Sequence, residues 1–266
     1  MKKLMTACAV CLIGGWVSAQ IPSVNIVGYM TQTISQKNNM IGLNFGTVGI
    51  EGGAIPVQDV IPGNQAGLKT GPNAAVADNI QVLGDSGYTV YYLSNGVFGK
   101  INDPAVSNKW VESGASVATA ATIPVGGAFW YISQNGLTSP FSITLAGQVA
   151  QDATLTRQIK AGLNMIASGY AYDIVLNAAG TGLNLGKVGT NAGVADSIQV
   201  LADGAYTVYY LSNGVFGKIN DPAVSNTWVE SGASVATDAA VPAGAAAWYI
   251  NRGSEFTWNH TRPYSL

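Results

Sequence analysis

Hydrophobic residues in this chain occur in short runs rich in Val, Ile, Thr and aromatic side chains, which Gly, Asn, Asp and Pro separate. Such a pattern predicts β-strands joined by turns, whereas helical stripes bounded by capping residues are scarce. In the first half of the chain we expect strands at 24–33, 40–45, 79–83, 88–93, 97–101, 109–112, 128–132 and 141–145. Short strands at this spacing are typical of a β-sandwich or small barrel, so the predicted fold class is all-β.

The strand expected at 88–93 is apolar on both of its faces, which is typical of a strand covered on both sides. One face carries Tyr88, Val90 and Tyr92, and the other carries Thr89, Tyr91 and Leu93. We expect a tight turn at 94–96, because Asn95-Gly96 tolerates positive φ angles, and a further turn at 102–104, where Pro104 restricts φ.

A 32-residue segment occurs twice in the sequence. Residues 88–119 and 206–237 are identical except that Thr227 in the second copy replaces Lys109. A long internal repeat predicts two copies of one folding unit. The near-identity of this segment, against much weaker similarity elsewhere, fits either recent recombination between the copies or selection for two equal binding surfaces.

Weaker matches extend the repeat over most of the chain. From residue 77 onward, matching residues of the two copies are 118 positions apart. Residues 39–41 match 164–166, which are 125 positions apart. The first copy therefore carries about seven extra residues, which we place in a loop at 49–63 because of its two prolines. In the second copy, 154–161 is open to a helical interpretation, since Arg157 and Lys160 interrupt any alternation.

The first nineteen residues are typical of a secretory signal peptide. Two lysines precede a mostly apolar run, and Val17-Ser18-Ala19 supplies the small residues of a cleavage site before Gln20. We therefore expect a signal peptide at 1–19 and tandem homologous β-domains at 20–148 and 149–266. The mature protein would be secreted, in an extracellular, cell-surface or periplasmic location. Cys8 and Cys11 both fall in the signal, which predicts a mature chain without disulfides or thiolate metal ligands.

Charge limits the partners that the mature chain can have. It would keep 10 basic and 14 acidic residues, a net charge near −4, which argues against nucleic acid as a partner. Charged residues make up 10% of the whole chain, compared with about 25% in typical domains, and this suits a protein that packs against neighbours. No later segment is long and apolar enough for a transmembrane helix.

The titratable residues do not form a catalytic pattern. The acidic residues that recur in both copies lie singly, and their clearest settings, Gly84-Asp85-Ser86-Gly87 and Asn102-Asp103-Pro104, favour ordinary turn chemistry. The recurring pairs are Asp78 and Asp196, Asp85 and Asp203, Asp103 and Asp221, and Glu112 and Glu230. The single histidine, His260, has no motif around it, and no zinc, calcium or phosphate-binding motif is present. We therefore expect no enzymatic activity, no metal and no cofactor.

Aromatic residues recur at matching positions and have two interpretations. The favoured one is core packing, since large rings must fill the interior of a small β-unit. The other is a stacking platform for sugar rings, for which the retained candidates are Tyr91, Trp110, Tyr209 and Trp228.

The order of motifs resembles a family of secreted bacterial β-repeat proteins without an assigned activity. The motifs are Val27-Gly28-Tyr29, Asp78-Asn79-Ile80-Gln81-Val82, Gly87-Tyr88-Thr89-Val90-Tyr91-Tyr92, Trp110 and Pro124-Val125-Gly126-Gly127-Ala128-Phe129-Trp130-Tyr131. In the second copy Ala146-Gly147-Gln148 takes the place of the first motif. The resemblance implies secretion and β-repeats, and it implies no catalysis.

Together these features predict a non-catalytic structural or adhesion protein of the cell surface or matrix, built from a duplicated β-domain. Its expected partners are further copies of itself, the cell envelope or glycans. The alternative is a pair of tandem carbohydrate-binding modules that use exposed aromatic residues.

Overall fold

The computed structural model describes residues 26–35, 37–50, 52–136 and 139–265, so the expected signal peptide lies outside the described residues. The chain is nearly all β, with 53% of residues in strands and 3% in helices, which confirms the predicted fold class. The elements of the first half are β1 (Val27–Ile34), β2 (Asn38–Gly42), β3 (Phe45–Gly46), β4 (Ile55–Pro56), the one-turn helix α1 (Val57–Val60), β5 (Asn79–Gly84), β6 (Gly87–Phe98), β7 (Ile101–Glu112), β8 (Thr122–Ile123), β9 (Ala128–Ile132) and β10 (Phe141–Val149).

The second half has the same order of elements except that it has no described counterpart of β3 or α1, and a short 3-10 helix, η1, lies further along, between β13 and β14. Its elements are β11 (Thr154–Ile159), β12 (Gly162–Ala167), β13 (Ile174–Val175), η1 (Leu183–Leu185), β14 (Ser197–Ala202), β15 (Ala205–Phe216), β16 (Ile219–Glu230), β17 (Ala240–Val241), β18 (Ala246–Asn251) and β19 (Phe256–Thr261).

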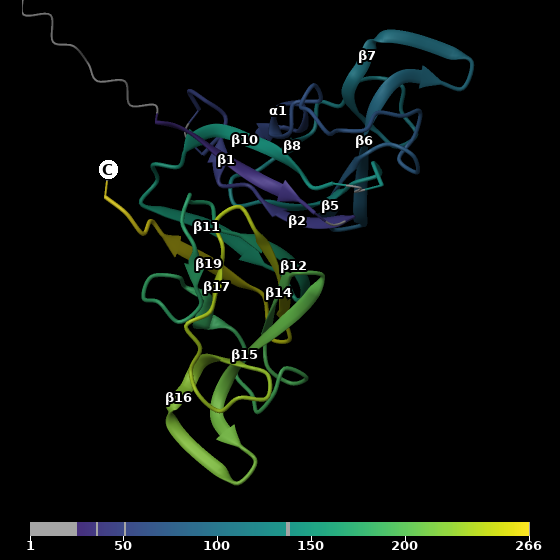
Figure 1. Cartoon of the computed structure of the whole chain (residues 1–266). Coiled ribbons are helices and arrows are strands. Elements are labelled where there is room, and N and C mark those ends of the chain that lie inside the picture. Colours follow the sequence, from purple (N-terminus) through teal and green to yellow (C-terminus); the bar gives the residue numbers. More distant parts are fainter. Residues whose placement is uncertain (1–25, 36, 51, 137–138, 266) are drawn as a thin grey trace, which may run out of the picture.

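Two five-stranded antiparallel sheets with matching strand order form the framework (Figure 1). The first has the order β2-β9-β5-β6-β7, and the second has the order β12-β18-β14-β15-β16. Beside them, β1 pairs with β10 and β11 pairs with β19. The first strand of each half is thus hydrogen-bonded to the last strand of the same half.

The helical interpretation of 154–161 is wrong. β11 alternates between exposed and more buried positions along its whole length, with Arg157 on the less exposed side. Arg157 fits there because its guanidinium donates to the Gly126 carbonyl at 2.8 Å, so the cation does not break the alternation. Because β11 takes the place of β1, Ala146–Gln148 does not open the second half; it lies in β10, opposite β1.

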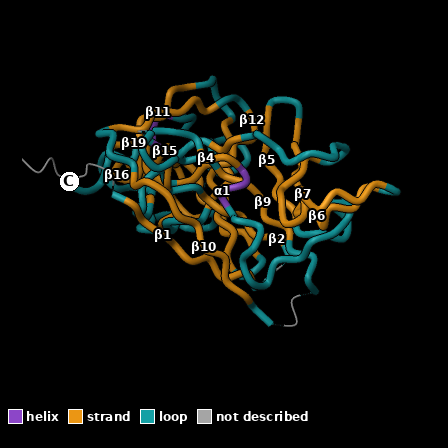
Figure 2. Tube along the Cα trace, turned by 90° about the horizontal axis from the view of Figure 1, so that it is seen from above, coloured by secondary structure: helices purple, strands orange, loops and turns teal. Residues whose placement is uncertain are grey.

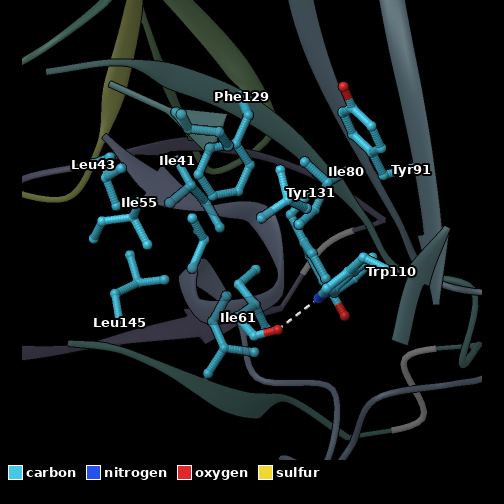
Figure 3. Close-up of a cluster of buried hydrophobic side chains, with 14 of the residues drawn as sticks. Ile41, Leu43, Ile55, Ile61, Ile80, Tyr91, Trp110, Phe129, Tyr131 and Leu145 are labelled. Carbon is cyan, nitrogen blue, oxygen red and sulfur yellow. Dashed lines mark hydrogen bonds between the residues drawn. The ribbon is translucent and has the colours of Figure 1, made fainter. Parts of the chain in front are cut away.

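The core of the first half lies between its five-stranded sheet and the sheet β1-β10-β3. Ile80, Tyr91 and Trp110 come from the larger sheet and meet Ile143 and Leu145 of β10 in one buried cluster (Figure 3). A matching cluster in the second half contains Ile198, Tyr209, Trp228 and Trp258. Tyr91 and Leu93 face the core while Tyr92 packs in a separate cluster on the other side, which confirms the predicted faces of this strand.

The long hairpins correct the predicted turns at 94–96 and 102–104. β6 and β7 have 12 residues each, and both predicted turns lie inside these strands. Asn95-Gly96 forms an irregularity in the ladder, with Gly96 at φ 81°, rather than the chain reversal. The reversal comes after Phe98, so a long arm projects from the body (Figures 1 and 2). Its counterpart β15–β16 projects at the other end of the molecule (Figure 1).

The expected loop at 49–63 also contains regular structure, namely β4 and α1. Ile41 and Ile166 occupy matching positions 125 residues apart, but the matching Ile55 and Ile174 are 119 residues apart. Six of the extra residues therefore lie between β2 and β4, in the first part of the expected loop and just before it.

The two halves meet through the outer faces of their five-stranded sheets. Met40 and Ala128 of the first half and Met165 and Ala246 of the second are buried in one shared cluster, with Trp130 and Trp248 packed against it. The Gly42 amide donates to the Gly244 carbonyl at 2.8 Å across this contact. A Cβ on Gly42 would lie 2.5 Å from that of Ala167, so glycine is required for the close approach.

Candidate functional site

The four residues retained as a sugar platform do not form one. Tyr91, Trp110, Tyr209 and Trp228 have exposed fractions of 7%, 0%, 9% and 0%. All four belong to the core clusters because their strand positions face inward. The platform at these residues is therefore a wrong prediction, and the core interpretation of the same rings is confirmed.

The surroundings of the two tryptophans show how the core is anchored. The Trp110 indole donates to the Ile61 carbonyl at 2.6 Å (Figure 3). Gln58 bonds the backbone of Trp110 from both sides, accepting from its N–H at 3.0 Å and donating to its carbonyl at 2.6 Å. In the second half Asn177 makes the same two contacts with Trp228, but the Trp228 indole N–H has no partner among the described residues.

The turn interpretation of the carboxylates is wrong for Asp78 and Asp196, which are fully buried. Asp78 accepts hydrogen bonds from the Tyr131 hydroxyl at 2.6 Å and from the backbone amides of Lys69 and Gln134. Burial, and then the Asp78 charge and hydrogen bond, raise the pKa of Tyr131 far above its usual value. The buried Asp78 carboxylate thus supplies acceptors for three donors of the core.

Asp196 repeats the arrangement with Tyr249, whose hydroxyl donates to it at 2.9 Å, and with the Arg252 amide at 2.7 Å. The exposed Asp103 and the half-buried Asp221 do show turn-type chemistry, since each accepts from the backbone amide two residues later at 3.0 Å. Both residues lie inside strands, β7 and β16. Their hydrogen bonds to the backbone therefore occur where the strand pairing is irregular, and not at a chain reversal.

His260 is buried in the second half rather than exposed for catalysis. Its ring stacks on Trp258, with the ring centroids 5.5 Å apart, and meets Tyr170 edge-on. Burial lowers the pKa of His260 to about 4. Across the described ranges, no group of three or more His, Cys, Asp or Glu residues is arranged to hold a metal ion.

A groove of about 600 Å³ lies on the outer face of the first five-stranded sheet, beside the contact between the halves. Tyr88 and Trp130 line it, together with Gln81 and Asn79, and the Trp130 indole donates to the Tyr88 hydroxyl at 3.2 Å. The alternation expected along this strand placed Tyr88 on the face opposite Tyr91, whereas the retained platform candidates Tyr91 and Trp110 lie on the buried face. The alternation of the strand carried the signal that identifies the groove.

The matching surface of the second half keeps the two rings but differs at its rim. Trp248 donates to the Tyr206 hydroxyl at 3.3 Å, as Trp130 does to Tyr88. Arg252 stands where the first half has Gln134, and its guanidinium donates to the Ala192 carbonyl at 2.9 Å. Since Gln134 and Ala74, the counterpart of Ala192, both line the first groove, Arg252 bridges the corresponding positions in the second half.

In the part of the chain that the structure describes, no helix has the length and apolar character that crossing a membrane requires. Comparisons with protein families, with curated proteins and with solved structures found no match.

Proposed function

We propose that this chain is a secreted, non-catalytic structural or adhesion protein of the cell surface or matrix, built from two tandem homologous β-sandwich domains at 20–148 and 149–266. The observation that carries the proposal is the pair of projecting hairpins. β6–β7 and β15–β16 have the same strand lengths and ladder irregularities at corresponding places, and their sequences differ only at Gly87 against Ala205 and at Lys109 against Thr227. Selection for two equal contact surfaces accounts for this near-identity.

The two-domain part of the proposal is supported by the distribution of buried residues. Each of the two largest hydrophobic clusters draws its residues from one half of the chain. Each half is also closed by pairing its own first and last strands, and β10 ends at Val149, next to the expected boundary. A unit with its own core and its own closing strands meets the physical description of a domain.

The hairpins have the chemistry of contact elements. At their tips Ile101 and Ile219 are each 60% exposed, although isoleucine is a residue that folding normally buries. β7 and β16 are the end strands of their sheets, so each arm presents a backbone edge as well as an apolar tip. Two such arms at separate ends of one molecule can hold two partners at once, which is the requirement for assembly or adhesion.

The test uses the chain from Gln20 to Leu266. Sedimentation velocity over a wide concentration range, and cosedimentation with cell envelopes of the source organism, measure self-association and envelope binding. We expect the double variant Ile101→Ser/Ile219→Ser to lose either activity, and each single variant to keep one-armed binding without bridging.

Val117→Ser/Val235→Ser is the matched control. These valines are each 66% exposed and also lie in the repeated segment, but outside the hairpins, so they should leave association unchanged. A protein that stays monomeric at every concentration and does not bind envelopes contradicts the proposal.

A further inference from the structure

The groove on the first half has the dimensions of a small-ligand site. Its volume of about 600 Å³ falls within the roughly 300–1,000 Å³ that is typical of such sites. β2, β9, β5 and β6 all contribute to it, so regular strands hold Tyr88, Gln81 and Trp130 in position, while Gln134 at the rim follows the end of β9. The Trp130 side chain is held in place because it also packs against the buried cluster between the two halves.

The lining combines two aromatic rings with neutral hydrogen-bonding groups. Tyr88 is 43% exposed at one side of the groove, and Trp130 lies next to it. The Gln81 amide donates to the Asn79 side-chain oxygen at 3.0 Å, and Asn79 donates in turn to the Ala74 carbonyl at 3.1 Å. These two hydrogen bonds orient the side-chain carbonyl oxygen of Gln81. No described residue donates a hydrogen bond to this oxygen, so it can accept one from a ligand hydroxyl.

These groups match the two surfaces of a sugar ring. The C–H faces of a pyranose are apolar and pack on Tyr or Trp, while its equatorial hydroxyls need amide and hydroxyl partners. Among the described residues that line the groove, Lys37 alone carries a full charge at neutral pH, so the site has little to offer a polyanion. We propose that the groove of Tyr88, Trp130 and Gln81 binds one stretch of an uncharged polysaccharide.

The second half presents a natural variant of the same surface in which the groove is bridged. Trp248 and Tyr206 keep the ring pair, and Gln199 matches Gln81. However, Ser197 replaces Asn79, and the Arg252 guanidinium reaches the Ala192 carbonyl across the rim. One chain therefore has one open site, in the first half. This inference does not depend on the hairpin contacts, because the groove and the hairpin tips have no residue in common.

Affinity electrophoresis of the chain from Gln20 to Leu266 tests the inference. Native gels contain laminarin, xylan, hydroxyethylcellulose, galactomannan or dextran, and parallel gels contain alginate or heparin. We expect at least one neutral polymer to retard the protein and the two polyanions not to retard it. Retardation by no polymer, or by the polyanions alone, overturns the proposal.

Paired variants then locate the site. Tyr88→Ala should weaken the affinity by about tenfold, a loss of roughly 1.4 kcal/mol, whereas Tyr206→Ala, the same change in the second half, should leave it unaltered. Equal weakening by both variants, or by neither, overturns the assignment to the first half. Urea unfolding of each variant confirms that it retains the fold.

Exchange of the rim residues gives an independent measurement. Gln134→Arg introduces the bridging side chain of the second half into the first and should abolish retardation without loss of stability. Arg252→Gln removes the bridge and should leave the first site intact. A stable Gln134→Arg protein that binds as well as the original chain contradicts the proposal.

Discussion

Trp110 and Trp228 occupy the same core position in the two halves of the chain, but among the described residues only Trp110 has an acceptor for its indole N–H. The acceptor, the Ile61 carbonyl, belongs to the segment that follows α1, and the described second half has no helix at that point. Both tryptophans lie within the repeated segments, which differ only at the preceding residue, Lys109 or Thr227. A nearly identical segment can therefore be equally buried in two surroundings and still differ in its polar contacts.

The same holds for the outer faces of the two sheets. The paired rings are kept in both halves, while one rim position, Gln134 or Arg252, separates an open groove from a bridged one. The comparison teaches that a single exchange at the rim can change an outer face on which the aromatic pair is kept.

The largest difference between the halves should come from their buried carboxylates. Asp78→Ala leaves three donors without an acceptor, at about 1–3 kcal/mol each, so we expect the free energy of unfolding to fall by about 3 kcal/mol or more. Asp196→Ala should cost about 1–3 kcal/mol less, because its side chain accepts from two groups, one donor fewer, among the described residues. Urea denaturation measures both, with the exposed Asp103→Ala as the control; equal losses for Asp78→Ala and Asp196→Ala would remove the difference.

His260 offers a pH-dependent comparison, since its counterpart in the first half is the buried Leu145. Burial lowers the pKa of His260 from 6.5 to about 4, so the unfolded chain binds a proton in this window that the folded chain does not. Stability should therefore fall as the pH drops from 6.5 to 4, by up to about 3 kcal/mol from this group. His260→Leu should flatten that part of the profile in thermal unfolding scans, and an unchanged slope contradicts the assignment.

The tryptophan comparison predicts a smaller asymmetry. Trp110→Phe removes an indole donor and leaves the Ile61 carbonyl buried without it, whereas Trp228→Phe removes a donor that has no partner among the described residues. The first change should cost about 1–2 kcal/mol more than the second. Both lose similar packing, so each variant serves as the control for the other in chemical denaturation.

The smallest effect is expected at the one position where the repeated segments differ. Thr227 donates to the Val224 carbonyl at 2.8 Å, while Lys109 stands at the same place on the first hairpin. Lys109→Thr should change the free energy of unfolding by less than about 0.5 kcal/mol. A larger loss in urea titrations would show that the two hairpins are not interchangeable.

Several parts of the fold follow from alternation along the sequence. The faces of β6 are correct because Tyr91 and Leu93 must be buried together, and β9 begins and ends at the predicted residues, 128 and 132. The turns on the long hairpin were wrong because Asn95-Gly96 is equally compatible with an irregularity inside a strand. Local propensity does not show how far two strands continue to pair.

The candidate groove could be predicted only in part. Alternation places Tyr88 and Gln81 on the outer sheet face, but nothing local shows that one end of this face is covered by the other half of the chain and that the rest is left open. The burial of Asp78 likewise depends on Tyr131 and Gln134, which are 53 and 56 residues away in the sequence and meet it only in the folded unit. Contacts between residues far apart in the sequence cannot be predicted from hydrophobic alternation or amino-acid composition.

The contact around Met40 and Met165 is made by matching residues of the two halves, so the apolar patch on each outer face is self-complementary. One pairing buries such a patch, which then cannot bind a second unit. A chain with three such units would leave one apolar face uncovered, while four could form two closed couples. The geometry thus favours even numbers of units, and a solitary unit should find its complement in a second molecule.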